Sequence, residues 1–299
     1  MNLRHLDHCP LCGSVHLKHV LTCTDCYATG EHFDLLECSL CGFKMTQDVP
    51  VESEIGRYYE SPDYISHTDT KAGLMNRIYH WVRDYMLKRK ARLVEQACGL
   101  KNGHLLDIGC GTGYFAHTMQ QRHWQVQAIE KSADARAFAQ QEFGLHVQDD
   151  RFTDSFPDGQ FHAITLWHVM EHIENLPQLW SALFRQLRAD GRLIVAVPNC
   201  SSADAQKYGP LWAAYDVPRH LWHFTPTTLP QMAAQYGFQL CSRYPMPFDA
   251  FYVSMLSEKY KGSSLYFLKG LWAGALCGLK SLTHADRSSS IIYVFRKKQ

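Results

Sequence analysis

The segment Leu105-Leu-Asp-Ile-Gly-Cys-Gly-Thr-Gly113 decides the fold expected of this chain of 299 residues. An apolar strand leads into Asp107, and the chain then passes through three glycines at alternate positions into a helical stretch. Without Cβ atoms, the backbone of such a turn can approach a bound ligand closely. The third glycine follows the second by two residues, whereas the dinucleotide fingerprint requires three. The segment therefore predicts a ligand-binding turn of an α/β protein and disfavours an NAD site.

A second strand-like segment, Val126-Gln-Ala-Ile-Glu130, also ends in an acid. Ligands of parallel α/β sheets bind beyond the carboxyl ends of the strands, so Glu130 and the glycine turn are expected at one edge. The Glu130 carboxylate is well placed to hold two ribose hydroxyls. Asp107 can either orient the loop or take a cationic amine.

These residues resemble motif I and the acid that follows it in class I S-adenosylmethionine (SAM) dependent methyltransferases. The resemblance continues through Phe156–His172 and Leu187–Pro198, and it covers about residues 100–200. It implies a Rossmann-like α/β sheet with helices on both faces, and SAM as cofactor. An acid after strand three would meet the adenine amine, with Asp149 and Asp150 both candidates. The cofactor-binding residues it implies are Asp107, Gly109, Cys110, Gly111, Gly113, Glu130, Lys131, Asp149, Asp150, Trp167 and His168.

The composition favours a globular protein without a strong electrostatic field. Hydrophobic residues make up 46% of the chain, and 30 Lys and Arg nearly balance 29 Asp and Glu. A net charge of +1 gives little attraction to a polyanion, which disfavours a nucleic-acid substrate. The first residues lack the apolar run of a signal peptide, and no uncharged apolar stretch reaches the length of a spanning helix. We expect a cytoplasmic protein without a transmembrane segment.

Cysteines are concentrated near the amino terminus. The pairs in Cys9-Pro-Leu-Cys12-Gly13 and Cys38-Ser-Leu-Cys41-Gly42 are near copies of one knuckle, and their four thiolates suit tetrahedral structural zinc. The pair in Cys23-Thr-Asp-Cys26 lacks the trailing glycine. We interpret it as part of a hairpin, with participation in the metal site as the alternative. Residues 1–50 are therefore expected to resemble a zinc ribbon, with Cys9, Cys12, Cys38 and Cys41 as metal ligands.

The rest of the chain is expected to comprise a helical connector, residues 51–100, and the methyltransferase domain, residues 101–299. The connector contains a predicted helix from Lys71 to Ala97, and its basic run Lys88–Arg92 is interpreted as a solvated face. Further predicted helices are Ala133–Phe143, Trp180–Leu187 and 224–237, and predicted strands are Phe238–Tyr244 and 290–296.

An insertion is expected at about 245–285, and it contains the apolar helix candidate 265–282. Leucines recur there at helical spacing, interrupted by three glycines, and Lys269 and Lys280 are its charged residues. We interpret it as a core or dimer helix. The alternative is contact with a membrane surface to reach a lipid acceptor. The sequence does not define the oligomeric state.

Residues after the predicted fourth strand and in the following loops could carry chemistry. Methyl transfer from a sulfonium needs chiefly in-line positioning, and a general base helps when the acceptor is a hydroxyl. His168, Glu171 and His172 have a spacing similar to the Glu-x-x-Glu-His run of ubiquinone-pathway O-methyltransferases, where these side chains serve a metal. Here a histidine replaces the first acid. We interpret Glu171 and His172 as loop-bonding and His168 as lining the SAM pocket, with a second metal site as the alternative.

The segment Tyr215-Asp-Val-Pro-Arg-His-Leu-Trp-His-Phe-Thr225 concentrates histidines beside an arginine and aromatic residues. It is similar to a run in bacterial methyltransferases that carry amino-terminal cysteine knuckles. Histidine can take a proton near neutral pH. The catalytic candidates are therefore His220, His223 and His168, and Arg219 could hold an anionic acceptor. A packed aromatic loop is the structural alternative.

The sequence favours a SAM-dependent methyltransferase acting on oxygen or carbon of a small-molecule acceptor such as a sugar or secondary metabolite. An RNA methyltransferase that uses the zinc ribbon for recognition is the alternative. Against it stand the near-zero net charge and the stretch Thr22–Leu36, which has no Lys or Arg. A non-catalytic protein that binds SAM or zinc is the third possibility.

Overall fold

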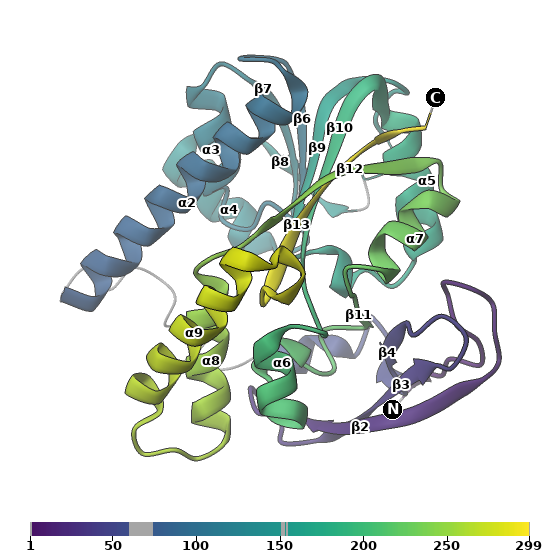
Figure 1. The fold of residues 1–299 in the computed structure, drawn as a ribbon. Helices are drawn as coiled ribbons and strands as arrows, with labels where there is room; N and C mark the ends of the chain where they lie inside the picture. Colours follow the sequence, from purple (N-terminus) through teal and green to yellow (C-terminus); the bar gives the residue numbers. More distant parts are fainter. Residues whose placement is uncertain (1, 60–73, 151–152, 154, 299) are drawn as a thin grey trace.

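A seven-stranded sheet with helices on both faces forms the centre of the computed structural model (Figure 1). The structure describes residues 2–59, 74–150, 153 and 155–298. Strands β6 to β10 run parallel, whereas β13 runs antiparallel to both β10 and β12. In sheet order the strands are β12 (Phe238–Pro245), β13 (Ser290–Lys297), β10 (Leu187–Pro198), β9 (Phe161–Trp167), β6 (His104–Ile108), β7 (Gln125–Ile129) and β8 (Val147–Gln148).

The order of these strands creates a switch point beside the glycine turn. From β6 the chain moves outward to β7 and β8, and it then returns to β9 on the other side of β6. Connections on either side of such a point leave a crevice at the carboxyl ends of the two strands. The expected α/β fold is confirmed, and the glycine turn lies where a ligand would bind.

Alternating side chains of the strands pack against two layers of helices. Leu105 belongs to a core shared with α2 and α3, whereas Leu106 belongs to the core formed with α5 and α7, and both are fully buried. This alternation follows from the two-residue period of a strand. The helices are α2 (Leu74–Cys98), α3 (Tyr114–Gln121), α4 (Ala133–Phe143), α5 (Leu176–Gln186), α6 (Ala203–Tyr208), α7 (Thr228–Gln235), α8 (Asp249–Tyr260) and α9 (Tyr266–Thr283).

Local capping explains several helix limits. The hydroxyl of Ser132 accepts from the Ala135 amide at the start of α4, and Gly144 ends that helix with a φ of 66°. Helix α5 begins one turn earlier than predicted because the Asn175 side chain accepts from the Gln178 amide. Residues 71–73 of the predicted connector helix lie outside the described residues.

The amino-terminal segment forms a second, smaller sheet, which also includes a short strand from the larger domain. Its order is β11-β4-β3-β2, and β11 comes from the loop after β10. Phe43 stacks with Trp222 at 6.1 Å and lies 5.6 Å from Phe224, so the module shares a core with the larger domain. The strands are β2 (Leu17–Thr24), β3 (His32–Cys38), β4 (Lys44–Thr46) and β11 (Trp222–His223); β1 (Leu3–Arg4) pairs separately with β5 (Val49–Pro50).

The expected insertion is a helical hairpin, α8 and α9, which projects from one end of the sheet (Figure 1). One face of α9 packs on α8 through Gly270 and Gly274. The opposite face, which includes Leu268 and Trp272, is exposed in the single chain. Of the expected core or dimer helix, the core alternative is therefore wrong, and the dimer alternative stays a prediction. None of the described helices is long and apolar enough to span a membrane.

Candidate functional site

Four cysteine thiols converge at one end of the small sheet. The Sγ atoms of Cys9 and Cys41 are 3.5 Å apart, as are those of Cys12 and Cys38, and all four lie within 4.8 Å of one another. Zinc–sulfur bonds of about 2.3 Å in a tetrahedron place sulfurs about 3.8 Å apart. The four thiols therefore have the identity and spacing of a structural zinc site.

Both knuckles depend on their trailing glycines. The amide of Gly13 donates to the Cys9 carbonyl, and that of Gly42 donates to the Cys38 carbonyl, each at 2.8 Å. Their φ values of 72° and 73° lie in the left-handed region that favours glycine. The pair Cys23 and Cys26 lies at the end of β2 and in the following turn, apart from this four-cysteine group.

The glycine turn folds back onto the end of β7. The amides of Gly109 and Cys110 both donate to the Ile129 carbonyl, at 2.8 and 2.9 Å. A Cβ on Gly109 would meet Val169 at 2.3 Å, and one on Gly113 would meet Leu145 at 2.7 Å. A Cβ on Gly111 would meet no atom within 4 Å. Two of the glycines thus serve packing within the protein, and Gly111 leaves its side of the turn open.

Glu130 lies directly after β7 and ties the turn to the next helix. Its carboxylate accepts from the Gly111 amide and from the Ser132 amide, each at 2.9 Å. These bonds place the acid at the turn, and its role as a ribose-binding residue stays a prediction. The neighbouring Lys131 pairs with Glu52 at 2.5 Å on the surface.

Asp107 is buried beneath the turn. One carboxylate oxygen accepts from the Thr165 hydroxyl at 2.7 Å, and the other has no hydrogen-bond partner among the described residues. Burial raises the pKa of Asp107 to about 7. The unpaired oxygen could accept from a ligand amine.

Lys90 of α2 is a site residue that the sequence interpretation missed. Its Nζ lies 4.4 Å from the ring centroid of Trp167 at the end of β9. Burial lowers the pKa of Lys90, and the nearby carboxylates of Asp249 and Asp107 offset part of this effect. The sequence predicts a solvated face for the basic run around it, and this prediction is wrong for Lys90. Its approach to Trp167 depends on how α2 packs against β9 and β10, which gives no local signal in the sequence.

Asp149 and Asp150 follow β8 at the same edge. Asp149 pairs with Arg136 at 3.2 Å. Burial and the adjacent Asp149 raise the pKa of Asp150. Of the two candidates for the adenine amine, Asp149 therefore already has a cationic partner.

His168 follows β9 and joins two carboxylates. Its Nε2 lies 3.1 Å from Asp249, and its Nδ1 lies 3.4 Å from Glu171. Burial alone would lower the pKa of His168, but the bonds to Asp249 and Glu171 outweigh it and raise the pKa to about 9. A protonated imidazole cannot accept a further proton, so His168 is not a general base in this arrangement. It instead holds the carboxylates of Asp249 and Glu171 in position.

Glu171, His172 and His220 form a compact group whose ligand atoms lie within 4.8 Å of one another. The Nδ1 of His172 donates to the Arg219 carbonyl, and that of His220 donates to the Ala214 carbonyl, each at 3.0 Å. The lone pair of each ring is consequently on Nε2, and the Nε2 of His220 lies 3.8 Å from Asp216. Burial and His220 lower the pKa of His172 to about 4, which keeps that ring neutral. The group could take a proton or a metal ion.

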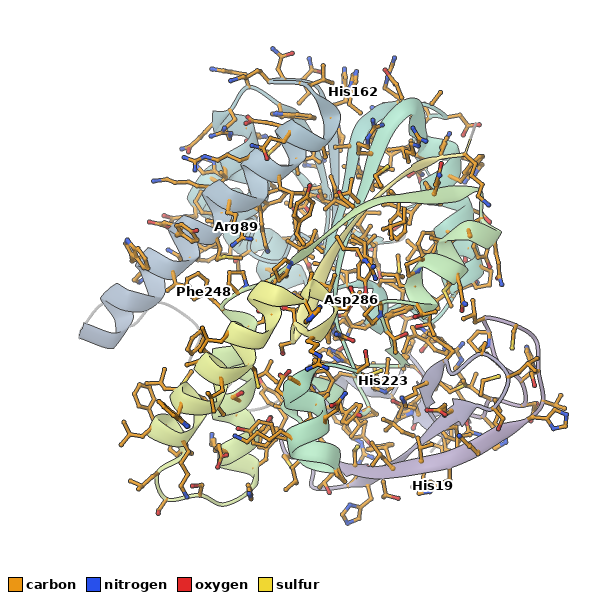
Figure 2. All side chains as sticks on the ribbon, in the orientation of Figure 1. His19, Arg89, His162, His223, Phe248 and Asp286 are labelled. Atoms are coloured by element: carbon orange, nitrogen blue, oxygen red, sulfur yellow. The ribbon has the colours of Figure 1, made fainter. Side chains whose placement is uncertain are left out.

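His223 occupies a different environment from His220. It lies on β11, at the junction of the module and the central sheet, and is buried (Figure 2). The Thr46 hydroxyl donates to the His220 carbonyl, so it accepts from His223 Nε2 at 2.9 Å. Burial lowers the pKa of His223 well below its ordinary value. Its contacts connect the loop to the module.

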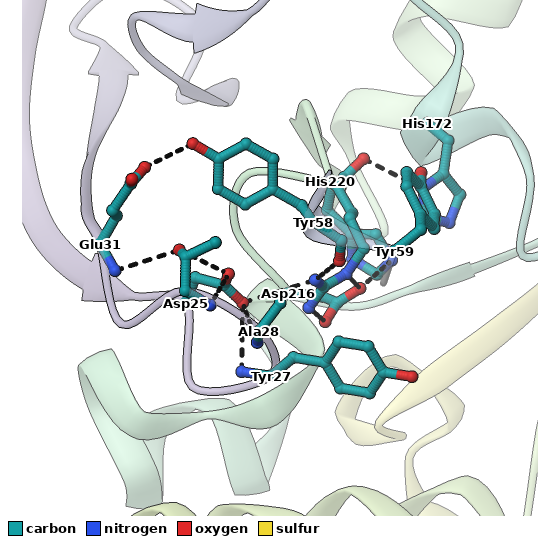
Figure 3. A network of polar contacts seen from close by, with 11 residues as sticks. Asp25, Tyr27, Ala28, Glu31, Tyr58, Tyr59, His172, Asp216 and His220 are labelled. Atoms are coloured by element: carbon teal, nitrogen blue, oxygen red, sulfur yellow. Dashed lines mark hydrogen bonds and ion pairs between the residues drawn. The ribbon is translucent and has the colours of Figure 1, made fainter. Parts of the chain in front are cut away.

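Arg219 is buried, and its partners Asp25, Tyr58 and Asp216 lie in one network of polar contacts (Figure 3). Its guanidinium donates two bonds to Asp216, at 2.6 and 2.9 Å, and also contacts the Tyr58 carbonyl and Asp25. Tyr27 lies against its other face, 4.3 Å from the guanidinium carbon. The expectation that Arg219 holds an anionic acceptor is not supported, because its donors already bind the loop and the module.

Comparison with known proteins gives an independent indication of what such a site does. A family model described as a methyltransferase domain matches residues 78–243. Malonyl-[acyl-carrier protein] O-methyltransferase from Serratia marcescens is 27% identical over 140 residues, which cover 45% of this chain and 54% of that protein. Ubiquinone biosynthesis O-methyltransferase from Pseudomonas fluorescens is 27% identical over 114 residues, covering 36% and 49%. The chain spans about half the length of these curated relatives.

Solved structures share the fold at low sequence identity. Geranyl diphosphate C-methyltransferase from Streptomyces coelicolor A3(2) aligns with a TM-score of 0.51 and 16% identity, covering 77% of this chain and 88% of that one. A putative sarcosine dimethylglycine methyltransferase from Galdieria sulphuraria aligns with a TM-score of 0.50 and 12% identity, covering 74% and 88%. At these identities the likeness concerns the fold alone.

Proposed function

The chain belongs to the methyltransferase-domain family, whose model matches more than half of it, and on this premise we propose that it transfers a methyl group from SAM to a small-molecule acceptor. The glycine turn at the switch point carries the proposal, because Glu130 and Asp107 converge there. The O-methyltransferases among its relatives support an acceptor of small size. The cytoplasm remains the expected location.

The residues at the turn fit the polar groups of SAM. Glu130 would hold the ribose hydroxyls, and the unpaired oxygen of Asp107 would accept from the cofactor's amine. Asp150 would take the adenine amine, since Asp149 is paired with Arg136. Gly111 would let the cofactor lie against the backbone. When bound, SAM supplies a methyl group on a positive sulfur, which needs chiefly alignment with the acceptor.

His220 is the proposed general base for a hydroxyl acceptor. Its Nε2 carries the lone pair, and the carboxylates of Glu171 and Asp216 lie beside it to stabilise the charge that it would gain. His168 would hold Glu171 in place, and His223 would fix the loop against the module. An oxygen acceptor would lose its proton to His220 as the methyl group arrives.

The four-cysteine group is proposed to bind one structural zinc ion. Its sheet shares strand β11 with the loop that carries His220, which supports a role in shaping that loop. Recognition of RNA by the module is less well supported. Its exposed Lys18 lies 2.9 Å from Glu37, whose other oxygen lies 3.1 Å from Lys44, and such pairing reduces the field available to a phosphate backbone.

Calorimetry with SAM and its demethylated product tests the cofactor assignment. Glu130→Ala should weaken binding by about 1–3 kcal/mol, because polar partners lose their acceptor. Glu142→Ala, on the exposed face of α4, is the matched control and should bind normally. Equal affinity of the two variants for SAM would show that Glu130 does not bind the cofactor. No binding by the wild-type chain would contradict the proposed function itself.

A further inference from the structure

Helix α9 presents its large apolar residues outward. Those residues recur every three or four positions along one face, and each is between 43% and 69% exposed. In a water-soluble helix this stripe would face the core. The residues of this outward stripe are Leu268, Trp272, Leu276 and Leu279 of α9, with Leu265 directly before the helix.

The inward face of α9 consists of small residues. Gly270, Ala273, Gly274 and Cys277 are buried, and α8 lies against them. A Cβ on Gly270 would meet the Met255 Cα at 2.5 Å, and one on Gly274 would lie 2.6 Å from the Cα of Phe251. Small residues between helices and large residues outside are the arrangement that helices adopt in lipid.

The charges of the hairpin suit an anionic surface. Lys259, Lys261 and Lys269 are exposed at and near its tip. The two acids within it face the protein, because Asp249 binds His168 and Glu258 is buried beside the Tyr208 hydroxyl. Within the described part of the hairpin, exposed charge is therefore positive throughout. Basic residues beside an apolar face attract anionic lipid headgroups.

Aromatic residues accompany the leucines. Tyr252 of α8 and Tyr266 of α9 are exposed, as is Trp272 within the stripe. Tyrosine and tryptophan are enriched where apolar chains meet headgroups. No described helix is long and apolar enough to cross a bilayer, so insertion would be limited to the surface.

We propose that the α8–α9 hairpin is a membrane-binding site that inserts the outward stripe of α9 into the surface of an anionic bilayer. The stripe supplies the apolar contact, and the three lysines supply attraction to the headgroups. Covering the stripe with lipid removes its apolar side chains from water, which is favourable. The outward stripe and the three lysines include none of the expected cofactor-binding residues, and vesicle binding can be measured without methyl transfer.

The test is cosedimentation of the full chain with vesicles of phosphatidylcholine alone or mixed with phosphatidylglycerol. We expect binding to the mixed vesicles, weakened by salt. The pair Leu268→Gln and Trp272→Gln should lower the partition coefficient by about tenfold or more. Replacing Lys259, Lys261 and Lys269 by Gln should remove most of the preference for phosphatidylglycerol. Val15→Gln, an exposed apolar position on the module, is the matched control and should bind as wild type.

Two outcomes would overturn the proposal. One is equal vesicle binding by the wild-type chain and the stripe variant. The other is that the folded wild-type chain does not bind vesicles, whether light scattering shows it to be a monomer or a dimer. If it is a dimer, the stripe variant should be monomeric. The dimer would assign the stripe to a second copy of this chain. Circular dichroism of each variant establishes that it is folded, and these residues are already exposed, so their polar replacements leave the core unchanged.

Discussion

At the scale of single residues, the hydrogen bonds of two imidazoles define what they can do. His220 Nδ1 donates to a carbonyl, which leaves the lone pair on Nε2, whereas His223 Nε2 donates to the Thr46 hydroxyl inside a buried sheet. The sequence alone does not distinguish His220 from His223 as the candidate general base. Their environments now predict different consequences of mutation, since only His220 belongs to the group with Glu171 and His172.

We predict that His220→Ala binds SAM normally and loses turnover by about 10²–10⁴-fold, the usual contribution of a general base. The measurement is methyl transfer to an oxygen acceptor with SAM binding determined in parallel. His146→Ala, at an exposed position, is the control. His223→Ala should instead lower the melting temperature, because it leaves Thr46 without a buried donor. Full activity of folded His220→Ala would exclude the assigned base.

The bonds of His168 predict a pH dependence of stability. Its pKa is about 9 in the folded chain, against an ordinary value of 6.5. Because the folded state binds the proton more tightly, its contribution is complete below about pH 6.5 and is lost as pH rises through 9. Urea unfolding between these pH values should show a declining free energy of unfolding. Asp249→Asn, which removes the charge beside Nε2, should flatten the decline, and an unchanged slope would contradict the pairing.

At the scale of elements, the two knuckles form one metal site and the middle cysteine pair belongs to a hairpin. Metal analysis of the full chain should give about one zinc, and serine at Cys9, Cys12, Cys38 or Cys41 should release it. Cys23→Ser and Cys26→Ser should retain the metal, since these residues lie apart from the four-cysteine group. Equal zinc loss from the middle pair would assign it to the metal site.

Close packing of α8 and α9 gives a second prediction at this scale. Gly270→Ala should destabilise the chain by about 1–3 kcal/mol, because the added Cβ would meet the Met255 backbone. Gly278→Ala is the matched control on the same helix, where a Cβ meets nothing within 4 Å. That change should be neutral or stabilise by up to about 1 kcal/mol. Denaturant midpoints measure both, and similar effects would contradict the close approach.

Elements that depend on neighbouring residues could be predicted from the sequence. The glycine turn, the strand before Glu130 and the cysteine knuckles follow from local patterns, and the structure contains them. Features that depend on residues distant in sequence could not. Lys90 reaches Trp167 because α2 packs against β9 and β10. The direction of the leucines on α9 is set by glycines that fit against α8, which helical periodicity alone does not reveal.

At the scale of the whole molecule, the amino-terminal module packs closely against the larger domain. The change in composition near residue 50 does not reveal these contacts. Strand β11 leaves the larger domain to pair with β4, and Arg219 links the same loop to Asp25 and Tyr58 of the amino-terminal segment. The sequence boundary at residue 50 therefore divides a continuous core. Residues on both sides of it hold the loop that carries His220.

This shared core predicts that the two parts unfold together. With Co²⁺ in place of zinc, thiolate absorption reports the module and far-ultraviolet circular dichroism reports chiefly the larger domain. The two urea transitions should coincide, because separating the parts would expose Phe43, Trp222 and Phe224, which are buried against one another. Arg219→Met should shift both transitions together toward lower urea, since it leaves the charge of Asp25 without its buried partner. Two separate transitions would mean that the module folds independently and that the loop holding His220 is fixed by the larger domain alone.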